Sequence, residues 1–252
     1  MIDRNELTIL LDSWLEPHKI KDYTFNGLQF EGKNSITHIA CAVDVSLDTL
    51  TQAAKLGVDF LITHHGLIWG GLQKITSFDK NRIQILCENN MNLYCSHLPL
   101  DIHKTLGNNA LLIKLLNAKN TEEIFFDVGY YANIDTSYHQ LKEKIREHIS
   151  EKIVEMNFGP DKINKIAICS GGATLDLKAL FEASSKGVQT ILSGETNSLY
   201  YHYAKELKMN ILCAGHYATE TFGIKAVSRE IQKRYKDQKS IVYTFIDIPT
   251  GF

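Results

Sequence analysis

Three short segments of the chain are rich in residues that bind metal ions, and each follows an apolar run typical of a strand. They are Thr63-His64-His65-Gly66, Ser96-His97-Leu98-Pro99-Leu100-Asp101 and Gly215-His216-Tyr217-Ala218-Thr219-Glu220. Imidazole and carboxylate groups together suit divalent ions such as Zn, Mn, Fe, Co or Ni. Because the third segment is more than a hundred residues from the other two, only folding can unite them. The pattern predicts a buried metal centre with more than one ion.

The adjacent histidines His64 and His65 are the strongest single signal. They follow the apolar run Phe60-Leu61-Ile62. Because successive side chains of a strand point to opposite faces, the two imidazoles cannot both point into an apolar core. Each can meet a separate ion if the chain turns at Gly66. A pair of surface histidines is the simpler alternative, but it fits poorly with the apolar run. We therefore interpret both residues as metal ligands.

Two carboxylates are further candidates. Glu220 lies four residues after His216 at an expected helix start, so the two share one helix face, and a glutamate can bridge two ions. This spacing alone is weak evidence for a metal site, because such pairs are common on solvated helix faces. Its position directly after an apolar run strengthens the evidence. Asp101 follows a turn that contains Pro99, and it either caps a helix that opens near Lys104 or binds metal. On local grounds the two roles of Asp101 are equally supported.

The roles of the other histidines are less clear from the sequence. His97 lies closest to a strand end and is a ligand, a neighbour of the ligands or a catalytic group. His202, within Tyr200-Tyr201-His202-Tyr203, either lines the site or packs against its neighbours. His139 lies on a charged helical pattern and indicates a solvated surface. The turn Ser170-Gly171-Gly172-Ala173 could meet an anion, although a tight turn is the commoner explanation.

The bulk composition excludes several classes of protein. The chain has 252 residues, 44% of them hydrophobic, and a net charge of −2, without the basic block that nucleic-acid binding requires. No apolar run approaches the roughly 20 residues of a membrane span, so we expect no membrane association. The five cysteines are scattered without a CxxC pair, which favours reduced, buried thiols in a cytoplasmic protein.

Apolar runs alternate with amphipathic stretches along the chain, which predicts an α/β fold of βαβ units with a largely parallel sheet. The expected strands are 36–43, 58–63, 91–96, 124–132, 163–169, 188–193, 209–214 and 240–248. The expected helices are 6–15, 47–55, 81–89, 104–116, 138–148, 176–185, 199–207 and 220–235.

An internal repeat refines this expectation. The segment 36–40, with its following helix and Gly57-Val58, matches 163–167 with its helix and Gly187-Val188, and 91–96 resembles 209–214. The alternative explanation is that all βαβ units look alike, because apolar strands are built from few residue types, but the order and spacing of two consecutive matches favour duplication. We expect two similar α/β domains, 1–120 and 121–252, with the metal site in the cleft between them at the strand ends.

The chain resembles the Nif-three-like family, also called GTP cyclohydrolase type-two homologues, over its whole length. The resemblance rests on Asn26-Gly27-Leu28-Gln29, Ala42-Val43-Asp44, Thr63-His64-His65-Gly66, His97-Leu98-Pro99-Leu100-Asp101, Ser193-Gly194-Glu195, Gly215-His216-Tyr217-Ala218-Thr219-Glu220 and Asp247-Ile248-Pro249. It implies a toroidal homohexamer with two divalent metal ions per subunit. The implied ligands are His64, His65, Asp101, His216 and Glu220, with Glu220 as the bridge; the role of Glu195 stays open.

Two functions are consistent with these residues. The first is a metal-dependent hydrolase, related to GTP cyclohydrolases or phosphoesterases, that acts on a nucleotide or related small molecule through a water held by both ions. In this hypothesis His97 or His202 transfers protons. The second is a non-catalytic metal-binding hexamer that serves regulation, metal handling or partner docking. An open coordination position would favour the enzyme.

Overall fold

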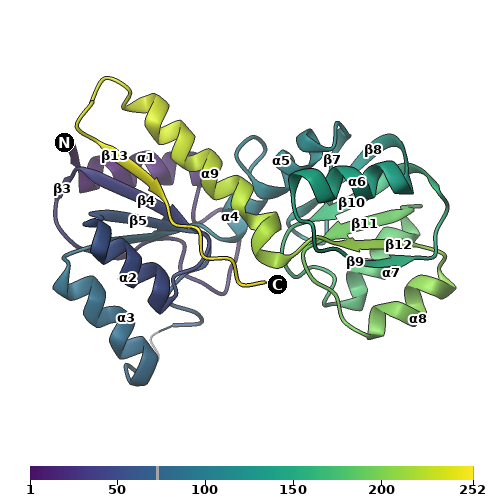
Figure 1. Cartoon of the computed structure of the whole chain (residues 1–252), viewed down its shortest axis with the longest axis horizontal. Helices are drawn as coiled ribbons and strands as arrows, with labels where there is room; N and C mark the ends of the chain where they lie inside the picture. The colour runs from purple at the N-terminus through teal and green to yellow at the C-terminus, as the bar shows by residue number, and fades with distance from the viewer. Residues whose placement is uncertain (72–73, 252) are drawn as a thin grey trace. The chain divides into compact units, whose positions relative to one another are not determined.

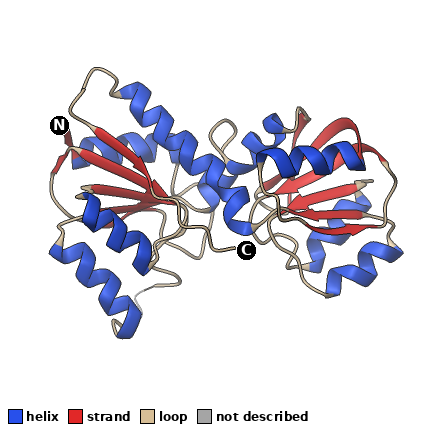
Figure 2. Ribbon diagram, in the orientation of Figure 1, coloured by secondary structure: helices blue, strands red, loops and turns tan. Residues whose placement is uncertain are grey.

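The computed structural model describes residues 1–71 and 74–251, which divide into two compact units (Figures 1 and 2). Unit 1 comprises Met1–Leu100 and Gly223–Ile248, and unit 2 comprises Asp101–Phe222 and the residues from Pro249 onward. This division differs from a single boundary near residue 120. The segment after Leu100 already contributes to the core of unit 2, and the C-terminal strand returns to the sheet of unit 1.

Unit 1 is built on a five-stranded sheet in the order β13-β4-β5-β6-β2, in which β2 is antiparallel to β6 and the other neighbours are parallel. A short antiparallel pair, β1 and β3, lies outside this sheet. The elements are β1 (Ile2–Asp3), α1 (Arg4–Leu15), β2 (Gly27–Phe30), β3 (Ser35–Ile36), β4 (His38–Ala42), α2 (Leu47–Leu56), β5 (Phe60–Thr63), α3 (Ser77–Glu88), β6 (Asn92–Cys95), α4 (Leu98–Asp101, whose last residue belongs to unit 2) and β13 (Val242–Phe245).

Local signals explain where the helices of unit 1 begin and end. The side chain of Ser46 accepts a hydrogen bond from the Thr49 N–H at the start of α2, and Gly57 ends this helix with a φ of 69°. Helices α2 and α3 cover one face of the sheet and α1 the other (Figure 1). The core under α2 and α3 consists of buried aliphatic side chains that include Leu50, Leu61 and Leu93.

Unit 2 is built on a six-stranded sheet in the order β7-β8-β10-β11-β12-β9, in which β10, β11 and β12 are parallel. The outer strands β8 and β9 pair antiparallel with β10 and β12. The elements are α5 (Asn108–Leu115), β7 (Lys119–Phe125), β8 (Gly129–Ser137), α6 (Tyr138–His148), β9 (Val154–Asn157), β10 (Lys162–Cys169), α7 (Leu177–Ser185), β11 (Thr190–Ser193), α8 (Leu199–Glu206), β12 (Asn210–Cys213) and α9 (His216–Arg234, which continues into unit 1).

The expected single strand over 124–132 is wrong, because this region is a hairpin of β7 and β8. The chain turns between them at Phe126 and Asp127, which adopt φ values of 46° and 65°. The antiparallel strands β2 and β9 were also not expected. Both are edge strands, with partly exposed residues that lack a continuous apolar run. Their pairing depends on the neighbouring strand and not on their own sequence pattern.

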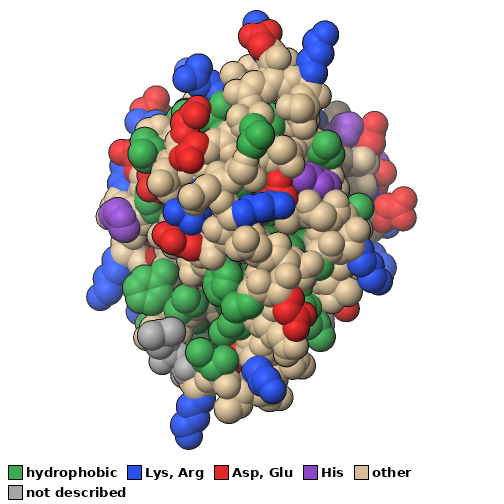
Figure 3. Space-filling model, turned by 90° about the vertical axis from the view of Figure 1, so that its left-hand side faces the viewer, with side chains coloured by type: hydrophobic (Ala, Val, Ile, Leu, Met, Phe, Trp, Pro, Cys, Tyr) green, Lys and Arg blue, Asp and Glu red, His purple; other side chains and the backbone are tan. Residues whose placement is uncertain are grey.

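The mixed α/β fold with parallel sheet segments is confirmed in both units. Each sheet contains three consecutive parallel strands, β4-β5-β6 in unit 1 and β10-β11-β12 in unit 2, flanked by an antiparallel edge strand next to the third. These are the strands that the sequence repeat relates, and the duplication itself stays a prediction. None of the helices in the described residues is long and apolar enough to cross a membrane. Figure 3 shows acidic and basic side chains interspersed over one face.

Candidate metal centre

Unit 1 brings three imidazoles together at the carboxyl ends of two neighbouring strands. His64 and His65 follow β5, and His97 follows β6, which is parallel to β5. The ring centroids lie 5.0 Å apart for His64 and His65, 5.1 Å for His64 and His97, and 5.5 Å for His65 and His97. One nitrogen of each ring lies within 4.8 Å of the others, a spacing that suits ligands of a metal ion. His64 is fully buried.

Each of these rings is oriented by a hydrogen bond at Nδ1. His64 Nδ1 lies 2.9 Å from the Ser96 carbonyl oxygen, and His65 Nδ1 lies 2.7 Å from Asp44 Oδ1. His97 Nδ1 lies 3.0 Å from Asp22 Oδ1. Because a carbonyl or carboxylate oxygen accepts, Nδ1 carries the proton in each ring, and Nε2 is the nitrogen that could bind a metal or accept a proton. Such outer hydrogen bonds are typical of metal-binding histidines.

Asp22 is a buried carboxylate whose charge is stabilised by its neighbours. Burial favours its neutral form, but the hydrogen bond and charge of His97, with hydrogen bonds from Asn26 and the Leu98 N–H, hold the pKa of this carboxyl well below its usual range. Its side chain is 2% exposed. Asp22 therefore remains ionised and fixes the orientation of the His97 ring.

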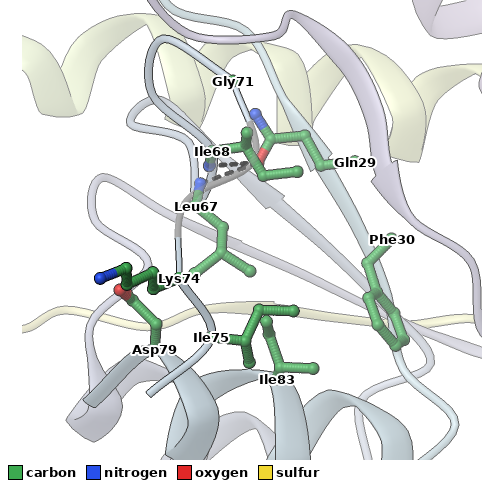
Figure 4. Close-up of a pocket in the computed structure, with 9 residues that line it drawn as sticks. All are labelled: Gln29, Phe30, Leu67, Ile68, Gly71, Lys74, Ile75, Asp79 and Ile83. Carbon is green, nitrogen blue, oxygen red and sulfur yellow. Dashed lines mark hydrogen bonds between the residues drawn. The ribbon is translucent and has the colours of Figure 1, made fainter. Parts of the chain in front are cut away.

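The loop after His65 is held in place from β2 (Figure 4). Gln29 Oε1 accepts hydrogen bonds from the Leu67 N–H at 2.7 Å and the Ile68 N–H at 3.3 Å. A side chain at Gly66 would collide with Gln29 and Thr24, because a Cβ there would lie 2.4 Å from Gln29 Nε2 and 2.2 Å from Thr24 Oγ1. Glycine at this position lets the chain turn directly after the two histidines, as the sequence predicts. Below the loop lies a largely apolar cavity of about 280 Å³.

Unit 2 holds a second group of donors at the start of α9. His216 Nε2 lies 3.1 Å from Glu220 Oε1, and His216 Nδ1 lies 2.5 Å from Glu195 Oε1. Glu195 thus takes the orienting position next to His216 that Asp44 takes next to His65. Its role was open in the sequence, and this contact supplies one. Glu220 is 3% exposed.

Asp101 lies in the same unit as Glu220 and is also buried, with 4% exposure. Its Oδ1 accepts hydrogen bonds from Asn108 Nδ2 and Ser170 Oγ, both at 2.8 Å. Gly107 is the N-cap of α5, so Asp101 does not cap this helix. One oxygen of Asp101 lies within 4.8 Å of an oxygen of Glu220. Two buried carboxylates this close repel each other, and a divalent cation relieves the repulsion.

The turn after β10 is held by hydrogen bonds within the protein. The Ser170 N–H donates to Asn109 Oδ1 at 2.7 Å, and the Gly171 N–H donates to Thr219 Oγ1 at 3.0 Å. Both backbone donors are therefore used inside the unit, which favours a tight turn over an anion site. The turn carries Gly171 against the carboxylate of Glu220, so that a Cβ at this position would displace the Glu220 side chain.

The remaining sequence candidates lie elsewhere. His202 is exposed on α8, with its ring centroid 5.3 Å from that of Tyr201. Among the described residues, no group of potential metal ligands includes it. His139 is exposed on α6, as expected for a solvated side chain. Asp22 and Asp44, which orient His97 and His65, were not identified as site residues, because neither lies next to a histidine in the sequence.

The cysteines are poor metal ligands in this structure. Burial raises the pKa of Cys41 and Cys213 to about 12, so both remain neutral thiols. Burial, followed by the negative charges of Asp101 and Glu220, raises the pKa of Cys169 well above its ordinary value. Only Cys87, on α3, is exposed, in contrast to the expected burial of all five thiols.

Alkylation of the native protein is therefore expected to modify one cysteine. Iodoacetamide should add a single label at Cys87, because reaction requires an accessible thiolate. Intact-mass and peptide mass spectrometry measure the number and position of labels. The Cys87→Ser variant should take no label when native, and the denatured wild type should take five. Rapid labelling of Cys95 or Cys169 in the native protein would contradict this burial.

Comparisons with known proteins cover the whole chain. The family model described as Duf34/NIF3 (NGG1p interacting factor 3) matches residues 2–251. A GTP cyclohydrolase 1 type 2 homolog from Pyrococcus abyssi is 36% identical, with 99% of this chain and 100% of the relative covered. A solved structure from Thermus thermophilus is 30% identical, with a TM-score of 0.89 and 100% of both chains covered. Reduced HcgD from Methanocaldococcus jannaschii is 25% identical, with a TM-score of 0.86 and 98% of both chains covered.

Proposed function

The chain belongs to the Duf34/NIF3 family, and from that premise we propose that it is a dinuclear, divalent-metal-dependent hydrolase of a nucleotide or related small molecule. The proposed ligands are His64 and His65 from unit 1 and Asp101, His216 and Glu220 from unit 2. Glu220 is the proposed bridge, because its two oxygens can each meet one ion. The homohexamer that the family resemblance implies is part of the same proposal.

The orientation of the histidine ligands carries this proposal. His64, His65 and His216 each have Nδ1 bound to an oxygen acceptor of their own unit: the Ser96 carbonyl, Asp44 and Glu195. Histidines that serve only for packing do not need this shared arrangement, whereas metal-binding histidines show it regularly. Buried, closely spaced carboxylates supply the negative charge that divalent ions require.

The mixed imidazole and carboxylate donors fit Zn, Mn, Fe, Co or Ni. Two such ions, when bound, supply Lewis-acid charge and lower the pKa of a coordinated water. The protein's own contribution is to hold the ligands and to move protons. His97 is the proposed proton-transfer group, because Asp22 accepts the hydrogen bond of its Nδ1–H and fixes the orientation of the ring. The exposed position of His202 on α8 favours His97 over His202 for this role.

Metal analysis followed by a hydrolysis screen tests the proposal. The purified protein is expected to contain about two divalent ions per chain by mass spectrometry of the metals. With that metal restored, it should hydrolyse one or more members of a nucleotide and phosphoester panel, and a chelator should remove the activity. Metal binding without turnover on any member would favour the non-catalytic alternative.

Substitution of His97 separates proton transfer from metal binding. The His97→Ala variant should keep its metal and lose about 10²- to 10⁴-fold in kcat, the usual contribution of a general acid or base. His202→Ala and the exposed control His139→Ala should keep both metal and turnover. Loss of metal in His97→Ala would show that His97 is a ligand, and normal turnover would remove it from the mechanism.

A further inference from the structure

Trp69 is a rigidly held aromatic ring at the edge of the unit 1 histidine cluster. Its ring centroid lies 5.2 Å from that of His97 in an edge-to-face arrangement, and 6.2 Å from that of His65. The indole Nε1–H donates a hydrogen bond of 2.7 Å to the Gly66 carbonyl oxygen, which fixes the ring relative to the turn after the histidines. Trp69 nevertheless remains 39% exposed.

The backbone on both sides of this ring is also held in place. Thr24 and Trp69 form an antiparallel bridge between two loops. The Gly70 N–H donates to the Tyr23 carbonyl oxygen at 2.7 Å, and Thr24 Oγ1 donates to the Ile68 carbonyl oxygen at 2.9 Å. The exposure of Trp69 is therefore a property of a fixed loop, and binding to the ring would cost little ordering of the protein.

The surroundings of Trp69 define the chemistry of a ligand that would bind there. The exposed part of an indole ring binds flat rings by stacking, and the imidazole of His97 beside it supplies a hydrogen-bonding group. A purely aliphatic ligand would cover the His97 imidazole without offering it a hydrogen bond, which is unfavourable. A flat ring that carries nitrogen and oxygen atoms satisfies both requirements.

We propose that Trp69 is a specificity-determining residue that stacks on the heteroaromatic ring of the substrate, such as a nucleobase, beside His97. The inference deepens the proposed hydrolase function and rests on it for the identity of the site. In this proposal, the ring of the substrate contacts residues of unit 1 only. Stacking of a base on an aromatic side chain contributes about 10-fold in affinity.

Tryptophan fluorescence tests this contact directly, because the chain has only two tryptophans, Trp14 and Trp69. In the metal-loaded Trp14→Phe variant, the emission comes from Trp69 alone. Guanosine monophosphate or adenosine monophosphate should quench and shift this emission. Ribose phosphate, which lacks the base, should leave it unchanged. Quenching is measured without turnover, so it can be observed even if the hydrolysis screen of the proposed function fails.

Calorimetric titration of variants in the wild-type background provides the second measurement. Trp69→Leu should weaken binding of the nucleotide about 10-fold with unchanged metal content, whereas Trp69→Phe should retain part of the affinity. The matched control is Phe78→Leu, which removes an exposed aromatic ring from α3 and should bind the nucleotide with normal affinity. Unchanged affinity in Trp69→Leu, loss of its metal, or absence of nucleotide binding by the metal-loaded wild type would each overturn the proposal.

Discussion

The Glu220→Gln variant is expected to lose metal-dependent stabilisation without any loss of stability in the metal-free state. Glu220 and Asp101 are both buried, and their carboxylates lie within 4.8 Å of each other. In the absence of metal, neutralising one of them removes a like-charge repulsion, so the metal-free variant should be as stable as the wild type or more stable. With metal at a hundredfold excess over its Kd, the wild type gains about 2.7 kcal/mol per site. The variant should lose this gain.

Thermal unfolding with and without a chelator measures both parts of this result, and metal analysis gives the bound ions per chain. Glu230→Gln is the matched control, since Glu230 lies on the same helix, α9, and pairs with Lys233 at the surface. This control should keep the full metal-dependent rise in Tm. A Glu220→Gln protein that binds metal normally would contradict the assignment of Glu220 as a ligand, and one that is less stable than the wild type in chelator would show that the contact of Glu220 with His216 outweighs the repulsion from Asp101.

The Gly171→Ala variant is expected to lose metal affinity although Gly171 itself offers no side-chain ligand. Its φ is 65°, and a Cβ there would lie 2.3 Å from Glu220 Oε1 and 3.1 Å from His216 Nε2. The new methyl group must displace the Glu220 carboxylate, which is 3% exposed and has little room to move. We expect the affinity for metal to fall about 10- to 100-fold, as when the orientation of a ligand is disturbed.

Backbone strain alone would also destabilise this variant, by about 1–2 kcal/mol for alanine in the left-handed region. Gly187→Ala isolates that contribution, because Gly187 has a φ of 69° in the same unit and a Cβ there meets nothing within 4 Å. Both variants should therefore lose this strain contribution in chelator, measured by urea unfolding, and Gly171→Ala should lose more, because its methyl group must also displace Glu220. Only Gly171→Ala should lose metal in a titration followed by calorimetry. Equal metal affinity in the two variants would show that the Glu220 carboxylate adapts.

Much of the fold could be predicted from the sequence, because the parallel strands of both sheets are buried. The continuous apolar runs around Leu61, Ile168 and Leu212 identify central strands without reference to the rest of the chain. The edge strands β2 and β9 were missed for the opposite reason: their residues are partly exposed, and their pairing with β6 and β12 is decided by neighbours distant in the sequence. The β7–β8 hairpin was missed because buried apolar residues, such as Phe125 and Tyr130, lie on both sides of its turn.

The candidate site shows the same contrast at the level of single residues. The sequence by itself determined the donor types and their places after strands, since His64, His65 and His97 lie next to apolar runs whose ends must meet at one edge of a parallel sheet. Only the tertiary structure decided which acceptors orient those rings and the ring of His216. Asp22, Asp44 and Glu195 come from other loops, and a hydrogen bond of about 3 Å depends on packing that no local pattern records. Tertiary packing also decided that Asp101 is buried beside Ser170 and does not cap a helix.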